Sequence, residues 1–506
     1  MVRCIPENDR LPHALYRAAQ VRELDRIAIE EFGIPGRTLM ERAGEAAFKL
    51  LRERWPEARD ITLLCGIGNN GGDAYVLARL ALQQGFTIHL LQLGDPGRLR
   101  GDALACAEAY RELNGAVFPY TGLPARTDVI VDGVFGTGLE REVAGRWRDA
   151  LEEVNRHAAP VLALDIPSGL HADTGEVLGI AVRADACISF IGLKRGMFTG
   201  QGPGHCGKIH FNALEVPAAI YARQILAARR LDWEQQSTLL QPRSRTAHKG
   251  EFGHLLVIGG APGYSGAARL AAQAGARTGA GLVSVATHPD HASIMNLNCP
   301  ELMCHGVQSG RDLTLLLKKA SVLAIGPGLG QNHWSRDLLG RVLDAGLPMV
   351  VDADALNLLA DDPMKRDDWV LTPHPGEAGR LLGKSSRQVQ ADRFVAVTDL
   401  QARYGGVIVL KGAGSLISDS RQRPPAVCSN GNPGMASGGM GDLLTGIIGG
   451  LLAQGFAAPD AACIGTCLHA AAADGSAREE GERGMLASDL LPWIRHLLNR
   501  ICIDRD

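Results

Sequence analysis

The chain has 506 residues, 46% of them hydrophobic and 21% charged, which provides for about two to four domains and excludes a disordered, fibrous or small disulfide-stapled protein. The net charge of −3 gives no overall field that would draw the chain to nucleic acid or to an anionic membrane. Glycine is abundant (62 residues) and aromatic residues are few (5%), a profile that favours a glycine-rich α/β enzyme.

Cysteine usage and the apolar segments indicate a cytoplasmic protein without a membrane span. The 11 cysteines are spread singly, without C-x-x-C pairs, as is typical of reduced and mostly buried thiols. The N-terminal MVRCIPENDR has no apolar segment behind its charges, so we expect no secretory signal. The longest uncharged stretch, 443–459, is shorter than the roughly 20 apolar residues that span a bilayer, and we expect it to be one buried helix.

Strands and helices are expected to alternate through the first half of the chain. Two helices, at 15–31 and 38–54, precede the series. Hydrophobic runs bounded by turn residues then predict strands at 61–65, 86–93, 128–135 and 160–166, with helices at 73–85, 101–113 and 146–156. Such alternation is typical of a parallel sheet with helices on both faces.

A polar segment without a strand signal separates this series from a second one. We place a linker at 223–245, between domains at 1–222 and 246–506. The second series predicts strands within 253–260, 282–287, 322–328, 348–356, 369–377 and 407–414, a small-residue helix at 266–281, and a long helical region from residue 441. We therefore expect a second α/β domain.

The segment CGIGNNGGD follows the first strand of the first domain. Its Gly66, Gly68 and Gly71 fit G-x-G-x-x-G, in which glycines let an anion approach the backbone and the helix N-terminus donates free N–H groups. A tight strand-to-helix turn is the alternative interpretation. The side chains of Asn70 and Asp73 favour the binding interpretation, because a bare phosphate would not need them.

Further polar residues follow later strands of the same domain. Because ligands bind beyond the carboxyl ends of parallel strands, we expect Asn70, Asp132, Asp165 and Ser168 to converge. Their oxygen atoms suit a hard alkali or alkaline-earth cation. The alternative is that Asp132 and Ser168 are helix caps.

The motifs LMERAG (39–44), NNGGD (69–73), DGVFGTGL (132–139) and DIPSG (165–169) resemble the YjeF N-terminal family of NAD(P)H-hydrate epimerases, over about residues 15–220. The resemblance implies a Rossmann-like three-layer αβα domain that interconverts the R and S epimers of hydrated NAD(P)H, NADHX and NADPHX. It implies substrate contacts from Asn69, Asn70, Gly71, Gly72, Asp73, Gly136, Thr137, Gly138, Leu139, Glu140, Arg141, Glu142 and Asp165. It also implies a potassium site at Asn70, Asp132 and Ser168.

Epimerisation needs a group that transfers protons. The hydrated carbon bears both a hydroxyl and the ring nitrogen, so its configuration can be lost and regained without a redox step. Asp165 is our candidate for the proton-transfer group. Lys194 is a second candidate, and a surface salt bridge is the alternative role for this lysine.

In the second domain, SNGNPGMASGGMGD (429–442) leads into a long helix with Asp442 in its first turn. The N-terminus of a helix can hold phosphate, and a carboxylate there can accept the proton of a hydroxyl that attacks phosphorus. Asp442 could instead only complement the helix dipole. This G-x-G-D arrangement resembles the ribokinase-like superfamily.

The motifs HKGEFG (248–253), GPGLG (326–330), DADALN (352–357), LTPHPGE (371–377) and KGAGS (411–415) narrow the resemblance to ADP-dependent NAD(P)H-hydrate dehydratases, over about residues 240–500. The resemblance implies nucleotide contacts from Lys411, Gly412, Ala413, Gly414, Ser415 and Gly441. It implies substrate contacts from Ala267, Gly328, His374 and Asp442. His374, which lies between two prolines, could instead be a rigid-turn residue.

Together the two resemblances imply a bifunctional nicotinamide-nucleotide repair enzyme. Its second domain would phosphorylate the S epimer with ADP, with Asp442 as the base and Mg²⁺ at the phosphates, and eliminate phosphate to leave AMP, phosphate and NAD(P)H. The resemblance further implies a homo-oligomer, and we expect no nucleic-acid or membrane partner from the net charge and the apolar segments. One rival hypothesis is a small-molecule kinase for a vitamin-like alcohol. Another is that the first domain is a nucleotide-binding module without chemistry.

Overall fold

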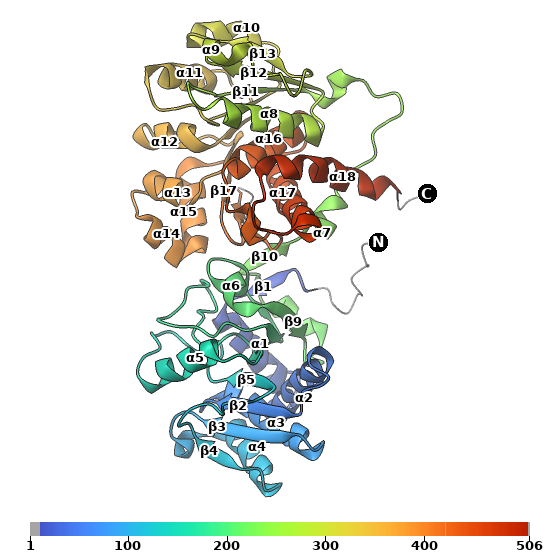
Figure 1. Ribbon diagram of the computed structural model, residues 1–506, viewed down its shortest axis with the longest axis vertical. Coiled ribbons are helices and arrows are strands. Elements are labelled where there is room, and N and C mark those ends of the chain that lie inside the picture. Colours follow the sequence, from blue (N-terminus) through green and yellow to red (C-terminus); the bar gives the residue numbers. More distant parts are fainter. Residues whose placement is uncertain (1–10, 420, 422, 504–506) are drawn as a thin grey trace. The chain divides into compact units, whose positions relative to one another are not determined.

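The computed structural model describes residues 11–419, 421 and 423–503, in two compact units divided between Arg229 and Arg230 (Figure 1). The segment MVRCIPENDR lies outside the described residues. The division falls within the predicted linker 223–245. This segment contains strand β10 (Ala228–Leu231) and helix α7 (Trp233–Ser237). No strand was expected here, since the segment is polar and β10 itself contains two arginines. The strand forms because β10 pairs with β1 (Ala14–Tyr16).

Unit 1 is built on a parallel sheet. Its strands are β2 (Asp60–Cys65), β3 (Thr87–Gln92), β4 (Val117–Pro119), β5 (Val129–Gly133), β6 (Val161–Leu164), β7 (Ala186–Phe190) and β9 (Lys208–Asn212). The strand order is β4-β3-β2-β5-β6-β7-β9, with all neighbours parallel. The parallel α/β domain is confirmed, although β4, β7 and β9 were not among the predicted strands. The order reverses between β2 and β5, which is where ligands bind in open parallel sheets.

Helices cover both faces of the unit 1 sheet. They are α1 (Ala18–Glu30), α2 (Gly36–Arg54), α3 (Asn69–Gln83), α4 (Gly101–Glu112), α5 (Arg146–Arg156) and the short α6 (Gly202–Cys206). Alternate residues of β2 enter different apolar clusters: Ile61 and Leu63 pack with α1 to α4, and Leu64 packs with α5. Two predicted bounds were wrong, because β1 precedes α1 and because α3 begins at Asn69 rather than at residue 73.

Unit 2 has a larger sheet of mixed direction. Its strands are β11 (His254–Ile258), β12 (Leu282–Thr287), β13 (Met303–Gly306), β14 (Val322–Ile325), β15 (Met349–Val351), β16 (Trp369–Leu371), β17 (Val407–Leu410), β18 (Leu416–Ser418) and β19 (Ala426–Cys428). They lie in the order β13-β12-β11-β14-β15-β16-β17-β18-β19. Neighbours from β13 to β17 are parallel, and β18 and β19 add antiparallel strands. The order reverses between β11 and β14.

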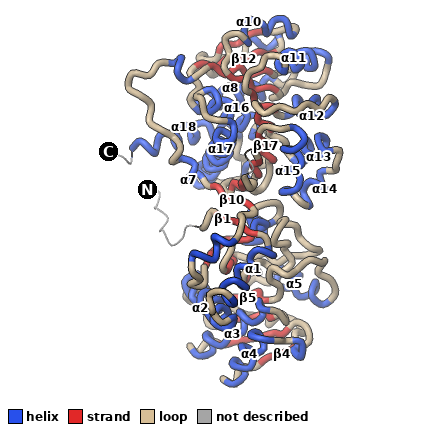
Figure 2. The backbone as a smooth tube through the Cα atoms, turned by 180° about the vertical axis from the view of Figure 1, so that it is seen from behind, coloured by secondary structure: helices blue, strands red, loops and turns tan. Residues whose placement is uncertain are grey.

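The helices of unit 2 lie on both sides of these strands (Figure 2). On one side are α8 (Ser265–Thr278), α16 (Met440–Ala453), α17 (Ala458–Glu480) and α18 (Leu490–Ile503), and on the other α11 (His333–Leu343), α12 (Ala353–Asp361), α13 (Pro375–Leu382), α14 (Ser386–Ala391) and α15 (Arg393–Tyr404). The short helices α9 (Pro289–Ala292) and α10 (Thr314–Leu317) complete the unit. The three-layer arrangement confirms the predicted second α/β domain.

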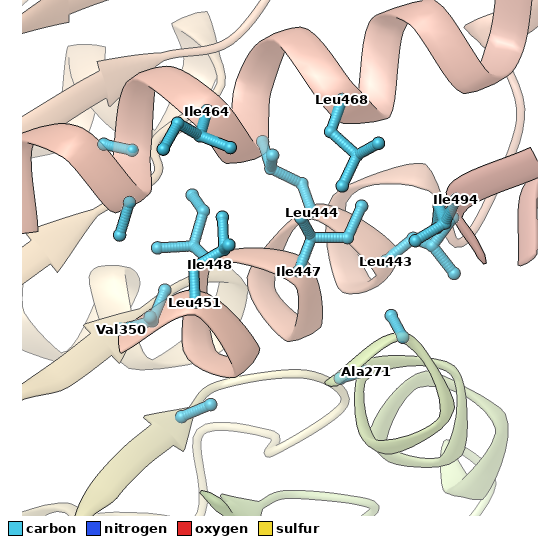
Figure 3. Packing of buried hydrophobic residues seen from close by; sticks show 14 of the residues in the cluster. Ala271, Val350, Leu443, Leu444, Ile447, Ile448, Leu451, Ile464, Leu468 and Ile494 are labelled. Atoms are coloured by element: carbon cyan, nitrogen blue, oxygen red, sulfur yellow. The ribbon is translucent and has the colours of Figure 1, made fainter. Parts of the chain in front are cut away.

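Helix α16 runs through this core, and its apolar side chains belong to the main cluster of buried residues (Figure 3). Every residue from Leu443 to Ala453 is buried, between α8 on one side and α17 on the other. A Cβ on Gly446 would lie 2.0 Å from Ala271 O, so only glycine allows α8 to approach this closely. The prediction of one helix over 443–459 was wrong, because Gly455, at φ +89°, separates α16 from α17. None of the helices in the described part of the chain is long and apolar enough to span a membrane.

Candidate functional site

The glycine turn of unit 1 joins β2 to α3. A Cβ on Gly66 would lie 2.0 Å from Val134 O, and a Cβ on Gly71 would lie 2.2 Å from Gly66 O. Close backbone packing therefore already requires glycine at these two positions. Gly68 has open space around it and caps α3. Phosphate binding at this turn remains a prediction.

Asn70, Asp132 and Ser168 come together in one buried cluster. The Ser168 hydroxyl donates to Asp132 Oδ1 (2.6 Å), and the Ser168 backbone N–H donates to Asp132 Oδ2 (2.8 Å). Phe135 joins them, because its N–H donates to Ser168 Oγ (2.8 Å) and its carbonyl accepts from Asn70 Nδ2 (3.1 Å). Neither Asp132 nor Ser168 caps any described helix, so the alternative role as caps is wrong.

Two features of this cluster suit a cation. Among the described residues, Asn70 Oδ1 is buried and has no hydrogen-bond partner. Burial raises the pKa of Asp132 to about 6, although hydrogen bonds from Ser168 and Val134 act in the opposite direction. A buried carboxylate and an unpartnered amide oxygen are both ligands that hard cations prefer.

Asp165 follows β6 in a strained conformation and forms an ion pair with Lys194. Asp165 has φ +64°, which is uncommon outside glycine and concentrates at functional sites. Lys194 lies in strand β8 (Leu193–Lys194), where its side chain is fully buried. Its ammonium donates to Asp165 Oδ1 and to Ser189 Oγ (3.0 Å). The alternative of a surface salt bridge for Lys194 is therefore wrong.

Two more carboxylates, Asp25 of α1 and Asp73 of α3, interact electrostatically with the same pair. Burial, and then the negative charge of Asp165, raise the pKa of Asp25 to about 7. The same two causes raise the pKa of Asp73 well above its ordinary value, whereas Lys194 lowers it. Sequence analysis missed Asp25, because a single aspartate in an amphipathic helix is usually solvated. Asp25 is brought to this group by the packing of α1 and by the loop between α1 and α2, and neither has a recognisable sequence motif.

The loop after β5 begins beside Asp165 and then runs out to the surface. A Cβ on Gly136 would lie 3.5 Å from Asp165 Oδ2 and 3.5 Å from Asn70 Cβ, so the loop begins beside the Asp165 group. Further along, the Thr137 carbonyl accepts from Arg22 Nη1 at 3.4 Å. Asn69, Gly138, Glu140, Arg141 and Glu142 are exposed, and Leu139 packs partly into the cluster around α5. Their substrate contacts remain predictions.

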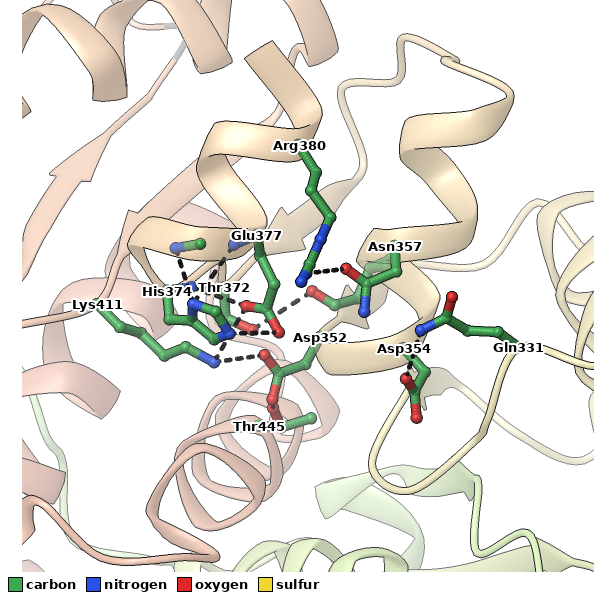
Figure 4. A network of polar contacts seen from close by, with 12 residues as sticks. Gln331, Asp352, Asp354, Asn357, Thr372, His374, Glu377, Arg380, Lys411 and Thr445 are labelled. Carbon is green, nitrogen blue, oxygen red and sulfur yellow. Dashed lines mark hydrogen bonds and ion pairs between the residues drawn. The ribbon is translucent and has the colours of Figure 1, made fainter. Parts of the chain in front are cut away.

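The second site lies at the carboxyl ends of β15, β16 and β17 (Figure 4). Lys411, directly after β17, donates from Nζ to Asp352 Oδ1 (2.6 Å), and its Nζ lies 3.9 Å from Glu377 Oε2. Thr445 of α16 donates from its hydroxyl to Asp352 Oδ2 (2.8 Å). Burial lowers the pKa of Lys411, but the charges of Asp352 and Glu377 outweigh it and leave the pKa raised.

Asp442 lies in the first turn of α16, as predicted from the sequence. Burial, and then the negative charge of Asp352, raise the pKa of Asp442 to about 7, while the positive charge of Lys411 lowers it. A Cβ on Gly441 would lie 3.2 Å from Lys411 Nζ. The N-terminus of α16 and the KGAGS segment therefore meet at one place.

His374 has a structural role at the start of α13. Its Nδ1 accepts from the Gly376 N–H (2.9 Å), and its own N–H donates to Glu377 Oε2 (2.8 Å), which together form a capping box. Burial, and then the positive charge of Lys411, lower the pKa of His374. The rigid-turn interpretation thus describes what the residue does here. Its imidazole is half exposed, and a substrate contact remains a prediction.

Gly328 and Ala267 also come together near this site. Gly328 has φ +58°, and a Cβ there would lie 3.2 Å from Ala267 Cβ. The same loop is fixed to α12, because the Gly330 N–H donates to Asp354 Oδ2 (2.8 Å). Asp354 in turn interacts electrostatically with Asp442.

Arg393 binds the backbone of the KGAGS loop (411–415). Sequence analysis did not predict this residue. Its side chain is fully buried, and Nη2 donates to the carbonyls of Leu410 (3.2 Å), Lys411 (3.3 Å) and Gly414 (3.5 Å). Burial lowers its pKa to about 10. An arginine at the start of an amphipathic helix gives no sequence signal for such a contact.

The Arg393→Lys variant is expected to lose about 2 kcal/mol of unfolding free energy. A single ammonium cannot keep both the Nη2 contacts with these carbonyls and the Nη1 contact with Gln390 Oε1 (2.7 Å), and unsatisfied buried groups are costly. Urea-induced unfolding of the full chain, followed by circular dichroism, measures the loss. The matched control is Arg387→Lys, at an exposed position of α14. Equal stability of the two variants would contradict the role given to Arg393.

Family models match both halves of the chain. The YjeF-related protein N-terminus matches residues 36–196, and the NAD(P)H-hydrate dehydratase family matches residues 255–496. A solved structure of a ribokinase-like superfamily protein from Enterococcus faecalis is 28% identical, with a TM-score of 0.51, over 55% of this chain and 97% of that chain. The fold and the two sites thus define a two-domain enzyme with a ribokinase-like second domain.

Similar full-length proteins identify the family. The bifunctional NAD(P)H-hydrate repair enzyme of Coxiella burnetii is 50% identical over 486 residues, which are 96% of this chain and 99% of that protein. The enzyme of Escherichia coli with the same name is 43% identical over 499 residues, 98% of this chain and 96% of that protein. The chain belongs to the bifunctional NAD(P)H-hydrate repair enzymes, with an epimerase domain followed by a dehydratase domain, and the predicted enzyme class is confirmed.

Proposed function

We propose that the two units act in turn on the same damaged nucleotide. Unit 1 interconverts the R and S epimers of NADHX and NADPHX. Unit 2 dehydrates the S epimer at the expense of ADP and releases AMP, phosphate and the restored NAD(P)H. The observation that carries the proposal is the placement of Asp442, with a pKa of about 7, beside Lys411 at the N-terminus of α16, because a general base is most effective when its pKa lies near the working pH.

The dehydratase step requires activation of the hydroxyl, because hydroxide is a poor leaving group. Asp442 accepts the hydroxyl proton while the oxygen attacks the terminal phosphorus of ADP, and AMP leaves. Phosphate then leaves from the hydrated carbon and the neighbouring ring carbon loses a proton to the solvent, which regenerates the double bond of the dihydropyridine ring. Lys411 and the N–H groups at the start of α16 offset the negative charge of the phosphates.

The site residues of unit 2 divide into a nucleotide-binding set and a hydrate-binding set. We assign nucleotide binding to Lys411, Gly412, Ala413, Gly414, Ser415 and Gly441, and hydrate binding to Ala267, Gly328, His374 and Asp442. Mg²⁺ would neutralise phosphate charge at this site. Magnesium sites of this kind use one or two carboxylates and rely on phosphate oxygens, and the carboxylates of Asp352 and Asp442 lie at this site.

In unit 1, Asp165 is the proposed proton-transfer group of the epimerase. Its ion pair with Lys194 and the nearby Asp73 and Asp25 provide several groups that can share protons in one buried place. We assign substrate binding to residues 69–73 and 136–142 together with Asp165. The proposal also includes a cytoplasmic location and self-association of the chain, both by resemblance to the family.

Potassium is the proposed ion at Asn70, Asp132 and Ser168. The cluster fits, since it combines a buried carboxylate with an amide oxygen that lacks a partner among the described residues. Replacing K⁺ by tetramethylammonium, which is too large for such a site, is expected to lower the epimerase rate at least about tenfold. Loss of residues that support a metal site commonly lowers activity by a factor of this size. Epimerisation of purified R-NADHX is followed by chromatography in both salts.

The control for the ion experiment is the Ser168→Ala variant, which removes one oxygen of the cluster. Its epimerase rate should respond less to K⁺ than that of the wild type, while its dehydratase rate stays unchanged. Equal epimerase rates of the wild type in the two salts would refute the potassium proposal.

The whole function is tested with acid-generated NADHX, a mixture of epimers, and ADP, by following the absorbance band of NADH. Complete recovery of NADH supports both activities, and recovery of the S fraction alone supports only the dehydratase. An absence of recovery refutes the proposal and favours the rival hypotheses of a small-molecule kinase or of a binding module.

A further inference from the structure

Asp352 is a buried acid at the centre of the second site, and neither the proposed chemistry nor the assigned contacts use it. It follows β15, and its side chain is 1% exposed. Ala353, the next residue, has φ +48°, a strained conformation for a residue with a Cβ. Strain of this kind persists only where the surroundings fix it, and it concentrates at functional sites.

The two carboxylate oxygens of Asp352 bind two different parts of the site. Oδ1 accepts from Lys411 Nζ (2.6 Å), and Oδ2 accepts from the Thr445 hydroxyl (2.8 Å). Figure 4 shows Lys411 and Thr445 reaching Asp352 from two sides. Thr445 is fully buried on α16, three residues after Asp442. Asp352 therefore connects the lysine of the KGAGS segment with the helix that carries the proposed base.

The charged groups around Asp442 explain why this connection affects chemistry. Asp352 after β15, Asp354 on α12 and Glu377 on α13 bring negative charge towards Asp442, and Lys411 brings positive charge. His469 on α17 is buried, and burial, followed by the charge of Lys411, lowers its pKa to about 4, so it is neutral. The face of α8 towards α16 is made of small apolar residues such as Ala271 and Ala274.

We propose that Asp352 is a positioning residue of the dehydratase, which fixes Lys411 and the first turns of α16 in one place and prevents this lysine from pairing with Asp442. Without Asp352, the ammonium of Lys411 would be left with Glu377 and Asp442 as its acidic neighbours, and an opposite charge at short range lowers the proton affinity of a carboxylate. The base would then be weaker and less available to the substrate hydroxyl. The inference rests on the proposed role of Asp442.

The test is the pH dependence of the dehydratase rate in the wild type and in the Asp352→Asn variant. In the wild type the rate should rise with pH through about 7, as the Asp442 carboxylate loses its proton. In Asp352→Asn, loss of one negative charge and release of Lys411 should move this rise about one pH unit lower. The maximal kcat should fall about tenfold, because a weaker base transfers the proton less well.

The matched control is Asp344→Asn, which removes a carboxylate of the same unit at an exposed position directly after α11. Its pH profile should shift less, and its maximal kcat should stay within about twofold of the wild type. If Asp352→Asn does not fold by circular dichroism, Thr445→Val replaces it. This variant keeps both charges but releases Asp352 from α16, and it should lower kcat with a smaller shift in the same direction.

Two outcomes separate the inference from the proposed function. If the wild type restores NADH from S-NADHX but the pH profile of folded Asp352→Asn coincides with that of the wild type, or shows a lower rate without a shift, the positioning role is refuted. If Thr445→Val is the variant used, a pH profile and a kcat equal to those of the wild type also refute the positioning role. If the wild type itself restores no NADH, the proposed function fails.

Discussion

The Asp442→Asn variant is expected to lose dehydratase activity by about 10²- to 10⁴-fold, the contribution that a positioned general base makes to a rate. The amide has the same shape as the carboxylate but cannot accept the hydroxyl proton. Asp442 lies in the first turn of α16 and interacts with Lys411, so the variant keeps the helix and loses the base. The initial rate of NADH formation from S-NADHX and ADP measures the effect.

The same variant decides between the base and a helix-dipole role for Asp442. A charge that only complements the dipole contributes about 0.3–1 kcal/mol to stability and nothing to the chemical step. A dipole role thus predicts a lower unfolding free energy at an unchanged rate. Asp149→Asn, in the first turn of the exposed helix α5, is the matched control. Full turnover by Asp442→Asn would refute the assignment.

For unit 1, the Asp165→Asn variant is expected to epimerise R-NADHX about 10²- to 10⁴-fold more slowly than the wild type. Asparagine is the suitable substitution, because it tolerates the left-handed conformation that φ +64° requires at this position. Alanine would add backbone strain to the loss of the carboxylate. In the combined assay with ADP, the S fraction should be restored at the normal rate and the R fraction should remain.

The S fraction serves as an internal control for this variant, because unit 2 has its own site. A variant that has lost its fold as a whole would restore neither fraction. The Lys194→Met variant tests the second candidate: if epimerisation persists in Asp165→Asn and disappears in Lys194→Met, the proton-transfer role belongs to the lysine. An unchanged epimerisation rate in Asp165→Asn would show that its carboxylate is not the acid or base.

The α/β architecture could be predicted from the sequence because its strands are buried on both faces and read as continuous apolar runs. β2 and β14 are examples, and each is followed by a glycine turn at the site. Lys411 and Asp442 could be predicted as candidate site residues, because Lys411 directly follows β17 and Asp442 begins a helix after a glycine-rich segment.

Features that depend on contacts distant in the sequence could not be predicted. Asp25 reaches the Asp165 group only through the packing of α1, and Arg393 reaches the KGAGS loop only through the packing of α15. The burial of Lys194 depends on the pairing of β8 with β1. The start of α3 at Asn69 was not predicted, because two glycines in a first turn usually indicate a loop. In the structure, the close approach of Gly71 to Gly66 O favours the helix.

The complete burial of α16 from Leu443 to Ala453 has a consequence for how the second site responds to heat. A helical segment that is buried on all faces does not unwind locally, since its opening would expose much of the apolar core to water, as global unfolding of the unit does. The buried part of this helix, which directly follows the proposed base, therefore keeps its place until unit 2 melts cooperatively. Thermal loss of dehydration should then be an all-or-none event, without a gradual decline at lower temperatures.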